Sequence, residues 1–242
     1  MFLEPKKSNP IAYRSYQELA ESYADLVPTK DYNAFYDRPA TLSLLEEIAG
    51  QKVLDAGCGP GIYTEILIQK QALVTALDVS ENMLEYARQR NGDQARYFLA
   101  DLELPLHFLL ENEFDGILSA LAVAYIHDLK VLFKEFNRIL KPDGWFVFST
   151  EHPFFGYTYF GLENYFNTQI VSSTWKSFDK KIEMPCYYHS LAHITDSLLQ
   201  NGFEIEKILE PLPTSDFKKV NPNGYAKRMN FPSFIHFRAR KK

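Results

Sequence analysis

The chain has 242 residues, a net charge of −5 and 46% hydrophobic residues, which is typical of one soluble α/β domain with a substantial core. Its only basic cluster is residues 238–242 and it has no long apolar run, so neither a nucleic-acid partner nor a membrane partner is expected. Two cysteines and no secretory leader predict a cytoplasmic protein.

The first 50 residues predict a helical leader. Apolar and aromatic residues recur at helical spacing in residues 13–26 and 38–49, which is typical of helices that bury one face. They are Tyr16, Leu19 and Tyr23 in the first segment, and Leu42, Leu45 and Ile48 in the second. The tyrosines could close over a ligand, or they could serve only in packing.

A glycine-rich turn follows the leader. Residues 52–56 read as a buried parallel strand and residues 62–70 as a helix, so Gly57, Gly59 and Gly61 occupy the turn between them. Glycine lets a ligand approach the backbone, and the start of the following helix favours a carboxylate or a phosphate. The turn therefore predicts a site for a small polar ligand.

Three acids stand at or near the ends of three consecutive predicted strands. Asp55 lies in the first strand, Asp78 ends the second (72–78) and Asp101 ends the third (97–101). The carboxyl ends of parallel strands are where open α/β sheets bind ligands. In such a unit Asp78 stands beside the glycine turn and could accept hydrogen bonds from ribose hydroxyls.

Strands and helices continue to alternate up to Thr150, which predicts a parallel sheet with right-handed crossovers. Ser80 is placed to cap a helix that runs to Arg90. The remaining predicted elements are a fourth strand at 114–119, helices at 131–140 and 188–201, and strands at 203–209 and 231–238.

An aromatic insertion, 152–187, separates the fifth strand from the next helix. Its aromatic residues show neither helical nor alternating spacing, which favours a lid over the strand ends; a dimer interface is the alternative. They are Phe154, Phe155, Tyr157, Tyr159, Phe160, Tyr165, Phe166, Trp175 and Phe178. The expected organisation is one domain (1–242): leader 1–50, cofactor-binding core 51–151, lid 152–187, and the rest of the sheet 188–242.

Four motifs together resemble the class I S-adenosylmethionine-dependent methyltransferases, in particular their small-molecule group. They are Val53 to Gly61 (VLDAGCGPG), Leu77 to Ser80 (LDVS), Leu99 to Leu102 (LADL) and Leu140 to Gly144 (LKPDG). The resemblance is strong over residues 50–150. It implies a Rossmann-like, seven-stranded, mostly parallel sheet with helices on both faces, and S-adenosyl-L-methionine as cofactor with S-adenosyl-L-homocysteine as product.

The resemblance also implies roles for individual residues. The first motif would hold the amino-acid end of the cofactor, Asp78 its ribose, and the second and third motifs its adenine. The residues implied are Asp55, Gly57, Cys58, Gly59, Gly61, Asp78, Val79, Met83, Asp101 and Leu102, with Ser119, Leu121 and Tyr125 after the fourth strand and Tyr16 from the leader. Packing in the core is the alternative for Met83 and Tyr125.

His152 is the first candidate for a general base or for a group that orients the acceptor. It follows the fifth strand and precedes Pro153, as in the resembled group, and imidazole titrates near neutral pH. The alternative is a histidine that only holds the base of the lid. Phe155, Trp175 and His189 are candidates for acceptor binding, and no metal site is expected.

The predicted function is transfer of a methyl group from S-adenosylmethionine to an oxygen or nitrogen of a small, partly apolar molecule. Two alternatives stay open. One is an NAD(P)-linked oxidoreductase, which is disfavoured because glycines at 57, 59 and 61 do not fit the G-x-G-x-x-G spacing. The other is a non-catalytic S-adenosylmethionine-binding regulator. A monomer or a homodimer is expected.

Overall fold

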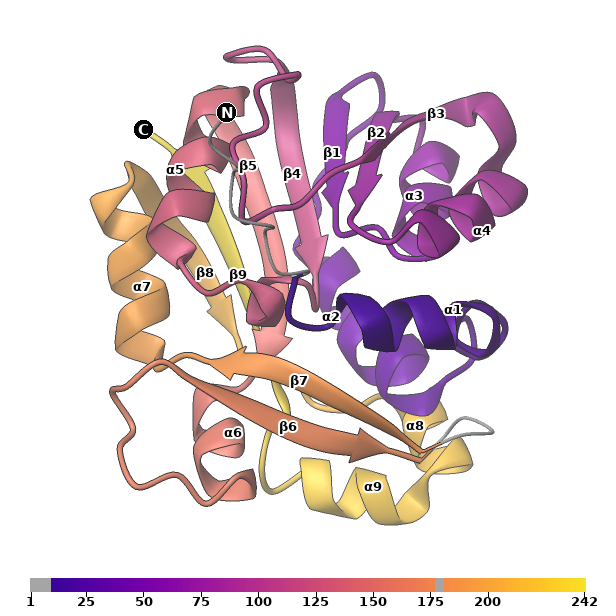
Figure 1. Cartoon of the computed structure of the whole chain (residues 1–242), viewed down its shortest axis with the longest axis vertical. Helices are drawn as coiled ribbons and strands as arrows, with labels where there is room; N and C mark the ends of the chain where they lie inside the picture. Colours follow the sequence, from indigo (N-terminus) through magenta and orange to yellow (C-terminus); the bar gives the residue numbers. More distant parts are fainter. Residues whose placement is uncertain (1–9, 177–180) are drawn as a thin grey trace, which may run out of the picture.

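A computed structural model of the chain describes residues 10–176 and 181–242, and it is centred on one seven-stranded sheet. The strands are β1 (Lys52–Ala56), β2 (Leu73–Asp78), β3 (Ala95–Leu99), β4 (Phe114–Ala120), β5 (Leu140–Glu151), β8 (Phe203–Leu209) and β9 (Phe234–Lys241). Their order is β3-β2-β1-β4-β5-β9-β8, and β9 is antiparallel to both of its neighbours (Figure 1). The predicted Rossmann-like, mostly parallel sheet is confirmed.

Helices cover both faces of this sheet. They are α3 (Ile62–Gln69), α4 (Glu81–Asn91), α5 (Leu129–Ile139) and α7 (Leu191–Gln200). On one face, Phe133 of α5 and Leu198 of α7 belong to a core cluster with Phe148 of β5, and on the other Leu67 of α3 packs with Val53 of β1. Ser80 caps α4 as expected, since its hydroxyl accepts from the Met83 amide.

The leader forms α1 (Tyr13–Leu26), a π-helical turn η1 (Asn33–Asp37) and α2 (Arg38–Ser43). The prediction of a helix from 38 to 49 is therefore wrong beyond Ser43. A helix that continued would use the Leu44 carbonyl internally, but the Arg238 guanidinium of β9 donates to that carbonyl at 2.7 Å. Leu44 and Ile48 are still buried against the sheet, so the apolar spacing correctly predicted that this segment packs on the core.

The insertion is regular where an irregular lid was expected. It contains α6 (Pro153–Tyr159) and a two-stranded antiparallel hairpin, β6 (Gln169–Trp175) and β7 (Ile182–Tyr188). In β7 the residues at 182, 184, 186 and 188 are all buried and alternate with more exposed ones, so the period of a strand is present. Phe178 lies outside the described residues.

The last part of the chain differs in detail from the prediction. The helix expected from 188 begins at Leu191, after its cap Ser190. The two last strands pair as a hairpin would, but the connection between them holds α8 (Ser215–Val220) and α9 (Pro222–Arg228). Two short 3₁₀ turns complete the description, η2 (Gly92–Gln94) and η3 (Val123–Tyr125).

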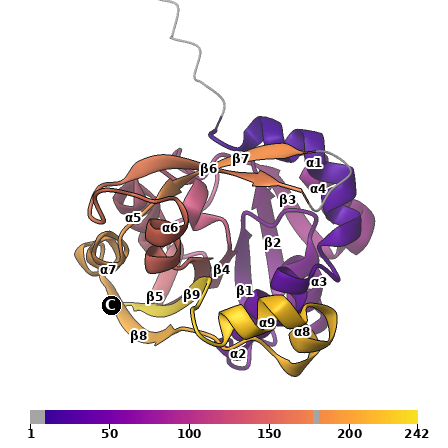
Figure 2. The same cartoon turned by 90° about the horizontal axis from the view of Figure 1, so that it is seen from below.

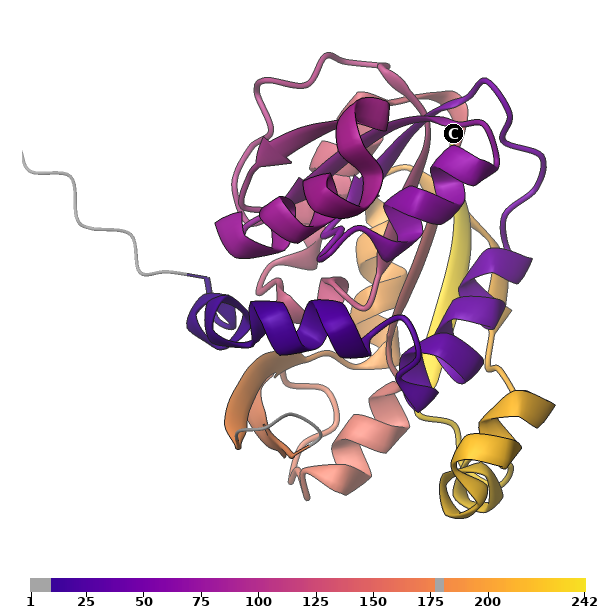
Figure 3. The same cartoon turned by 90° about the vertical axis from the view of Figure 1, so that its right-hand side faces the viewer.

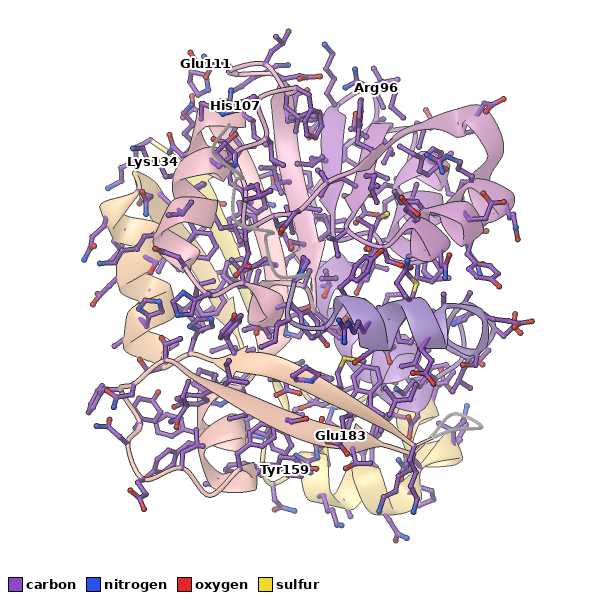
Figure 4. All side chains as sticks on the ribbon, viewed as in Figure 1. Arg96, His107, Glu111, Lys134, Tyr159 and Glu183 are labelled. Atoms are coloured by element: carbon purple, nitrogen blue, oxygen red, sulfur yellow. The ribbon has the colours of Figure 1, made fainter. Side chains whose placement is uncertain are left out.

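Helix α1 and the β6–β7 hairpin lie next to each other across the carboxyl ends of the parallel strands, and we call this pair the roof (Figures 2 and 3). The Ser15 hydroxyl of α1 donates to the Glu183 carbonyl of β7 at 2.7 Å. Figure 4 labels Glu183 on the hairpin, at the opposite end of the molecule from Arg96 and Glu111. None of the helices in the described part of the chain has the length and apolarity needed to span a membrane.

Candidate functional site

A cavity of about 1050 Å³, open mouth included, lies beneath the roof at the ends of β1, β2 and β4. Most of the residues predicted to bind the cofactor line it. These are Tyr16, Gly57, Cys58, Gly59, Asp78, Val79, Met83, Asp101, Leu102, Leu121 and Tyr125. They come from α1, the glycine turn, the ends of three strands and η3, so the fold brings together segments that are far apart in the sequence.

Asp55, Gly61 and Ser119 do not line this cavity. The Asp55 carboxylate lies below the turn and accepts from the Thr64 hydroxyl of α3 at 2.6 Å. Burial raises the pKa of Asp55 to about 7. The Ser119 hydroxyl donates to the Ala56 carbonyl at 2.9 Å. The two polar residues therefore tie β1 to its neighbours beneath the site.

The three turn glycines differ in what surrounds them. A Cβ on Gly57 would lie 2.6 Å from the Ala122 side chain, and one on Gly61 would lie 3.0 Å from the Ala87 backbone. A Cβ on Gly59 would meet nothing within 4 Å, although its φ of +52° also favours glycine. Gly57 and Gly61 thus allow close packing of the protein on itself, whereas Gly59 leaves space that opens into the cavity.

Asp78 is held rigidly at the end of β2. One carboxylate oxygen accepts from the Gly59 amide at 2.8 Å and the other from the Ser80 amide at 2.9 Å. Each oxygen retains a further lone pair that can accept another donor. Burial raises the pKa of Asp78, and the amide bonds oppose this shift. The arrangement suits a ligand with two neighbouring hydroxyl groups.

The end of β4 carries a strained residue. Leu121 has a φ of +54°, a conformation that costs a non-glycine residue about 1–3 kcal/mol. Its amide donates to the carbonyl of Ser149 at 3.0 Å and to the Ser149 hydroxyl at 3.1 Å, so β5 holds it there. This places the backbone of residues 121 and 122 at the cavity wall, opposite Gly57.

Tyrosines form the upper wall of the cavity. The hydroxyls of Tyr16 in α1 and Tyr125 in η3 lie 2.8 Å apart, and burial raises the pKa of both phenols well above the ordinary value. Tyr23 also lines the cavity, and the Trp175 ring stacks on Tyr23 with centroids 6.3 Å apart. Trp175 therefore supports this wall from behind without lining the cavity.

Asp37 and Arg38, two adjacent charged residues of the leader, also line the cavity and were not predicted from the sequence. Asp37 is 1% exposed; its carboxylate accepts from the Tyr63 hydroxyl at 2.8 Å and lies 3.1 Å from His236 Nε2. The Arg38 guanidinium donates to the carbonyls of residues 27 and 28, while its Nε has no partner. Asp37 ends η1 and Arg38 begins α2, and no pattern in the surrounding sequence distinguishes this pair from the other charged residues of the leader.

His152 lies away from this cavity, at the start of α6. Its Nδ1 accepts from the Phe154 amide at 3.2 Å, so Nε2 carries the proton and donates to a Glu210 carboxylate oxygen at 2.7 Å. With both ring nitrogens engaged and 3% of the residue exposed, the geometry favours the alternative that the sequence left open, a histidine that holds the base of the insertion.

The candidates for acceptor binding are spread over different places. Phe155 stacks on Tyr159, and the Arg228 guanidinium lies over its ring, outside the cavity described above. His189 is buried after β7, where Nε2 donates to the Ile126 carbonyl at 2.9 Å and Nδ1 lies 3.3 Å from the Thr168 hydroxyl. Burial lowers the pKa of His189 to about 4, so this ring is neutral at physiological pH.

Comparison with known proteins agrees with this geometry. A family model described as a methyltransferase domain matches residues 54–148. The chain is 29% identical over 208 residues to an uncharacterized protein of Haemophilus influenzae. This alignment covers 74% of the chain and 78% of that protein. It is 34% identical over 150 residues to a malonyl-[acyl-carrier protein] O-methyltransferase of Hamiltonella defensa, covering 62% of this chain and 55% of the relative.

The chain thus spans only about half the length of this curated methyltransferase. Among solved structures, an S-adenosylmethionine-dependent methyltransferase from Mesorhizobium loti aligns with a TM-score of 0.70 and 27% identity. The alignment covers 89% of this chain and 100% of that one. The likeness therefore extends beyond the matched domain.

Proposed function

The chain belongs to the class I S-adenosylmethionine-dependent methyltransferases, and from this premise we propose that it methylates an oxygen or nitrogen of a small, partly apolar molecule. The observation that carries the proposal is the enclosure of the cavity: α1 and the hairpin cover the strand ends, with Tyr16, Tyr23 and Tyr125 on the inside. An acceptor that reaches the end of β4 must fit beneath this roof.

The lining fits the parts of S-adenosylmethionine. We assign the ribose hydroxyls to Asp78, whose two oxygens keep lone pairs free, and the adenine to the pocket that contains Met83 and Leu102. The amino-acid end would pass the open space at Gly59. Its carboxylate would then face Arg38, and its ammonium group Asp37, because charges of opposite sign attract strongly where water is scarce.

S-adenosylmethionine supplies a methyl group on a positively charged sulfur. The tyrosine rings of the upper wall offer electron-rich faces, which stabilise a nearby cation by about 0.5–2 kcal/mol. The roof covers the strand ends, and the strained backbone at Leu121 fixes one side of the reacting region. Alignment of this kind can contribute about 7–11 kcal/mol to a transfer reaction, so positioning is the main task of these residues.

A second candidate function is methylation of a carboxylate on a malonyl carrier protein. It is favoured by the 34% identity to a malonyl-[acyl-carrier protein] O-methyltransferase. Only 55% of that relative is covered, and the first cavity offers one arginine, Arg38, which already donates to two backbone carbonyls. The nicotinamide-linked alternative is set aside, because the family is a methyltransferase family.

Two measurements test the proposal. Calorimetry with S-adenosylhomocysteine and with NAD should give binding of the first alone. Transfer of a labelled methyl group should then be measured to a panel of small alcohols, phenols and amines, and separately to a malonyl carrier protein. Labelling within the small-molecule panel supports the proposal, and labelling of the carrier protein alone supports the second candidate. Protein that binds no S-adenosylhomocysteine would contradict both.

A further inference from the structure

A second, smaller cavity lies between the end of β5 and the hairpin. Its empty space, open mouth included, is about 320 Å³, and its lining includes Ala124, Glu151, His152, Cys186, Tyr188 and His189. Ala124 faces this cavity, whereas the next two residues of the chain, Tyr125 and Ile126, line the first one. The two cavities are therefore separated by little more than the η3 turn, with the Tyr125 ring at the boundary.

Glu151 differs from the other polar residues of this lining. Both ring nitrogens of His152 and of His189 are engaged, and the Tyr188 hydroxyl donates to the Tyr165 carbonyl at 3.0 Å. Within residues 10–176 and 181–242, the Glu151 carboxylate makes no hydrogen bond or ion pair with another side chain or with the backbone. Glu151 is half-buried, so its carboxylate stays open to a ligand that can donate a hydrogen bond.

The charge of Glu151 affects titratable groups at both cavities. It contributes to the raised pKa of Tyr125, at the boundary of the first cavity, and to that of Cys186, which is raised to about 12 mainly by burial. Burial raises the pKa of Glu151 itself to about 7. No lysine or arginine is present in the lining of the second cavity, and His189 is neutral. An ionised Glu151 therefore gives this cavity a negative potential.

We propose that Glu151 is the residue that selects the methyl acceptor: its carboxylate binds the O–H or N–H group of the incoming molecule and takes the proton of that group during transfer. This inference rests on the proposed function. The site takes hydroxyl or amine acceptors and rejects carboxylates, because a second negative charge in a cavity without a cation is repelled.

The proposed step balances. A lone pair of the acceptor oxygen or nitrogen forms the new bond to the methyl carbon, and the carbon–sulfur bond breaks with its electron pair going to sulfur. The sulfur loses its positive charge. The acceptor proton moves to Glu151, which loses its negative charge. A methyl group thus replaces the proton on the acceptor atom, and no oxidant or reductant is needed.

The first experiment measures recognition in the S-adenosylhomocysteine-loaded protein, with three probes of similar size: phenethylamine, para-ethylphenol and phenylacetate. We expect the amine and the phenol to bind at least about tenfold more tightly than the carboxylate, because a hydrogen bond to a charged group contributes enough free energy for a tenfold change in affinity. In Glu151→Gln this preference should disappear. Glu204→Gln, which removes an exposed carboxylate on β8, is the matched control and should retain it.

The second experiment measures the pH dependence of methyl transfer to the better probe. The rate of the wild-type protein should rise with pH through about 7, as Glu151 loses its proton, and Glu151→Gln should be slower and should lose this rise. The other titratable groups that line or face the cavity are Tyr125 of η3, His152 at the start of α6, Cys186, Tyr187 and Tyr188 of β7, and His189.

The outcomes separate the two proposals. If S-adenosylhomocysteine does not bind, the proposed function fails. If it binds but the amine and the phenol do not, or if all three probes bind equally, the role of Glu151 alone is overturned. The same conclusion follows if Glu151→Gln keeps the wild-type preference and pH profile. Because glutamine has nearly the shape of glutamate, a melting temperature close to the wild-type value will show that the variant folds.

Discussion

The two cavities are built in different ways. Around the first, backbone groups close in sequence set the geometry: the amides of Gly57 and Cys58 donate to the Leu77 carbonyl, and the Gly59 amide donates to Asp78. Around the second, the polar groups are side chains from β5 and β7, which only the tertiary fold brings together. A frame of backbone groups does not depend on side-chain identity, whereas a site made of side chains changes with each substitution.

The glycine turn gives the largest expected effect and tests the backbone half of this comparison. Gly59→Val should abolish S-adenosylhomocysteine binding, a loss of more than about 100-fold, because its side chain fills the space that the ligand needs. Gly50 also has positive φ and open surroundings but does not line the cavity. Gly50→Val should therefore show a similar loss of stability with unchanged affinity in calorimetry. Equal binding by both variants would place the ligand elsewhere.

Asp78 joins the backbone frame to the ligand. Asp78→Ala should weaken S-adenosylhomocysteine binding by about 1.5–3 kcal/mol, the worth of hydrogen bonds to a charged group. It should also destabilise the turn, because the amides of Gly59 and Ser80 lose their acceptor. Asp93→Asn, at an exposed position in η2, is the control. Unchanged affinity in folded Asp78→Ala would remove Asp78 from the ribose site.

The raised pKa of Glu151 should make the free energy of unfolding depend on pH. Its folded pKa of about 7 lies above the ordinary value of 4.5, so the folded state binds more protons than the unfolded state between these pH values. The stabilising contribution is thus present below about pH 4.5 and lost as the pH rises to 7. Over this range Glu151→Gln should gain on the order of 1–3 kcal/mol relative to wild type. Parallel curves from urea unfolding would contradict the burial.

A variant of His152 tests whether the side chains around the second cavity serve stability or catalysis. Replacement of His152 by alanine removes a buried ring and its hydrogen bonds to the Glu210 carboxylate and the Phe154 amide, so the free energy of unfolding should fall by about 1–3 kcal/mol. Affinity for S-adenosylhomocysteine should stay the same. Methyl transfer that slows by about 10²–10⁴-fold in a variant of wild-type stability would instead restore His152 as the general base.

Tyr16→Phe should have the smallest effect. It removes the hydrogen bond to Tyr125 that links α1 to η3, which is worth about 0.5–1.5 kcal/mol. Tyr125→Phe should give a similar loss of stability, and the double variant should lose little more than either single one, because the shared bond can be lost only once. Additive losses in thermal unfolding would indicate that the two hydroxyls act independently.

The sequence predicted the fold well, because the order of strands follows from local patterns. Apolar runs that end in acids and the turn after β1 needed no long-range information. The helix expected beyond Ser43 failed because Arg238, almost 200 residues away in sequence, takes the Leu44 carbonyl. No pattern within the leader reveals such a partner.

The site was predictable to the same extent. Asp78, Gly57 and Gly59, which the motifs indicated, line the first cavity, whereas Gly61 does not. Sequence alone did not distinguish Glu151 from its neighbour His152, since only the fold shows that His152 has hydrogen-bond partners at both ring nitrogens. The hairpin was not predicted because Pro185 and the aromatic Tyr187 occupy less buried positions of β7, so the alternation of burial is not an alternation of apolar and polar residues.

The attachment of α1 has a consequence for the rate of turnover. The Gln17 side chain accepts from the Ser80 hydroxyl at 2.6 Å and from the Asn82 amide at 3.3 Å, so the roof is fastened directly to the start of α4 beside Asp78. A route for cofactor exchange that passes between α1 and α4 has to break this contact. We therefore expect release of S-adenosylhomocysteine to limit the steady-state rate, so that a pre-steady-state burst precedes slower cycling.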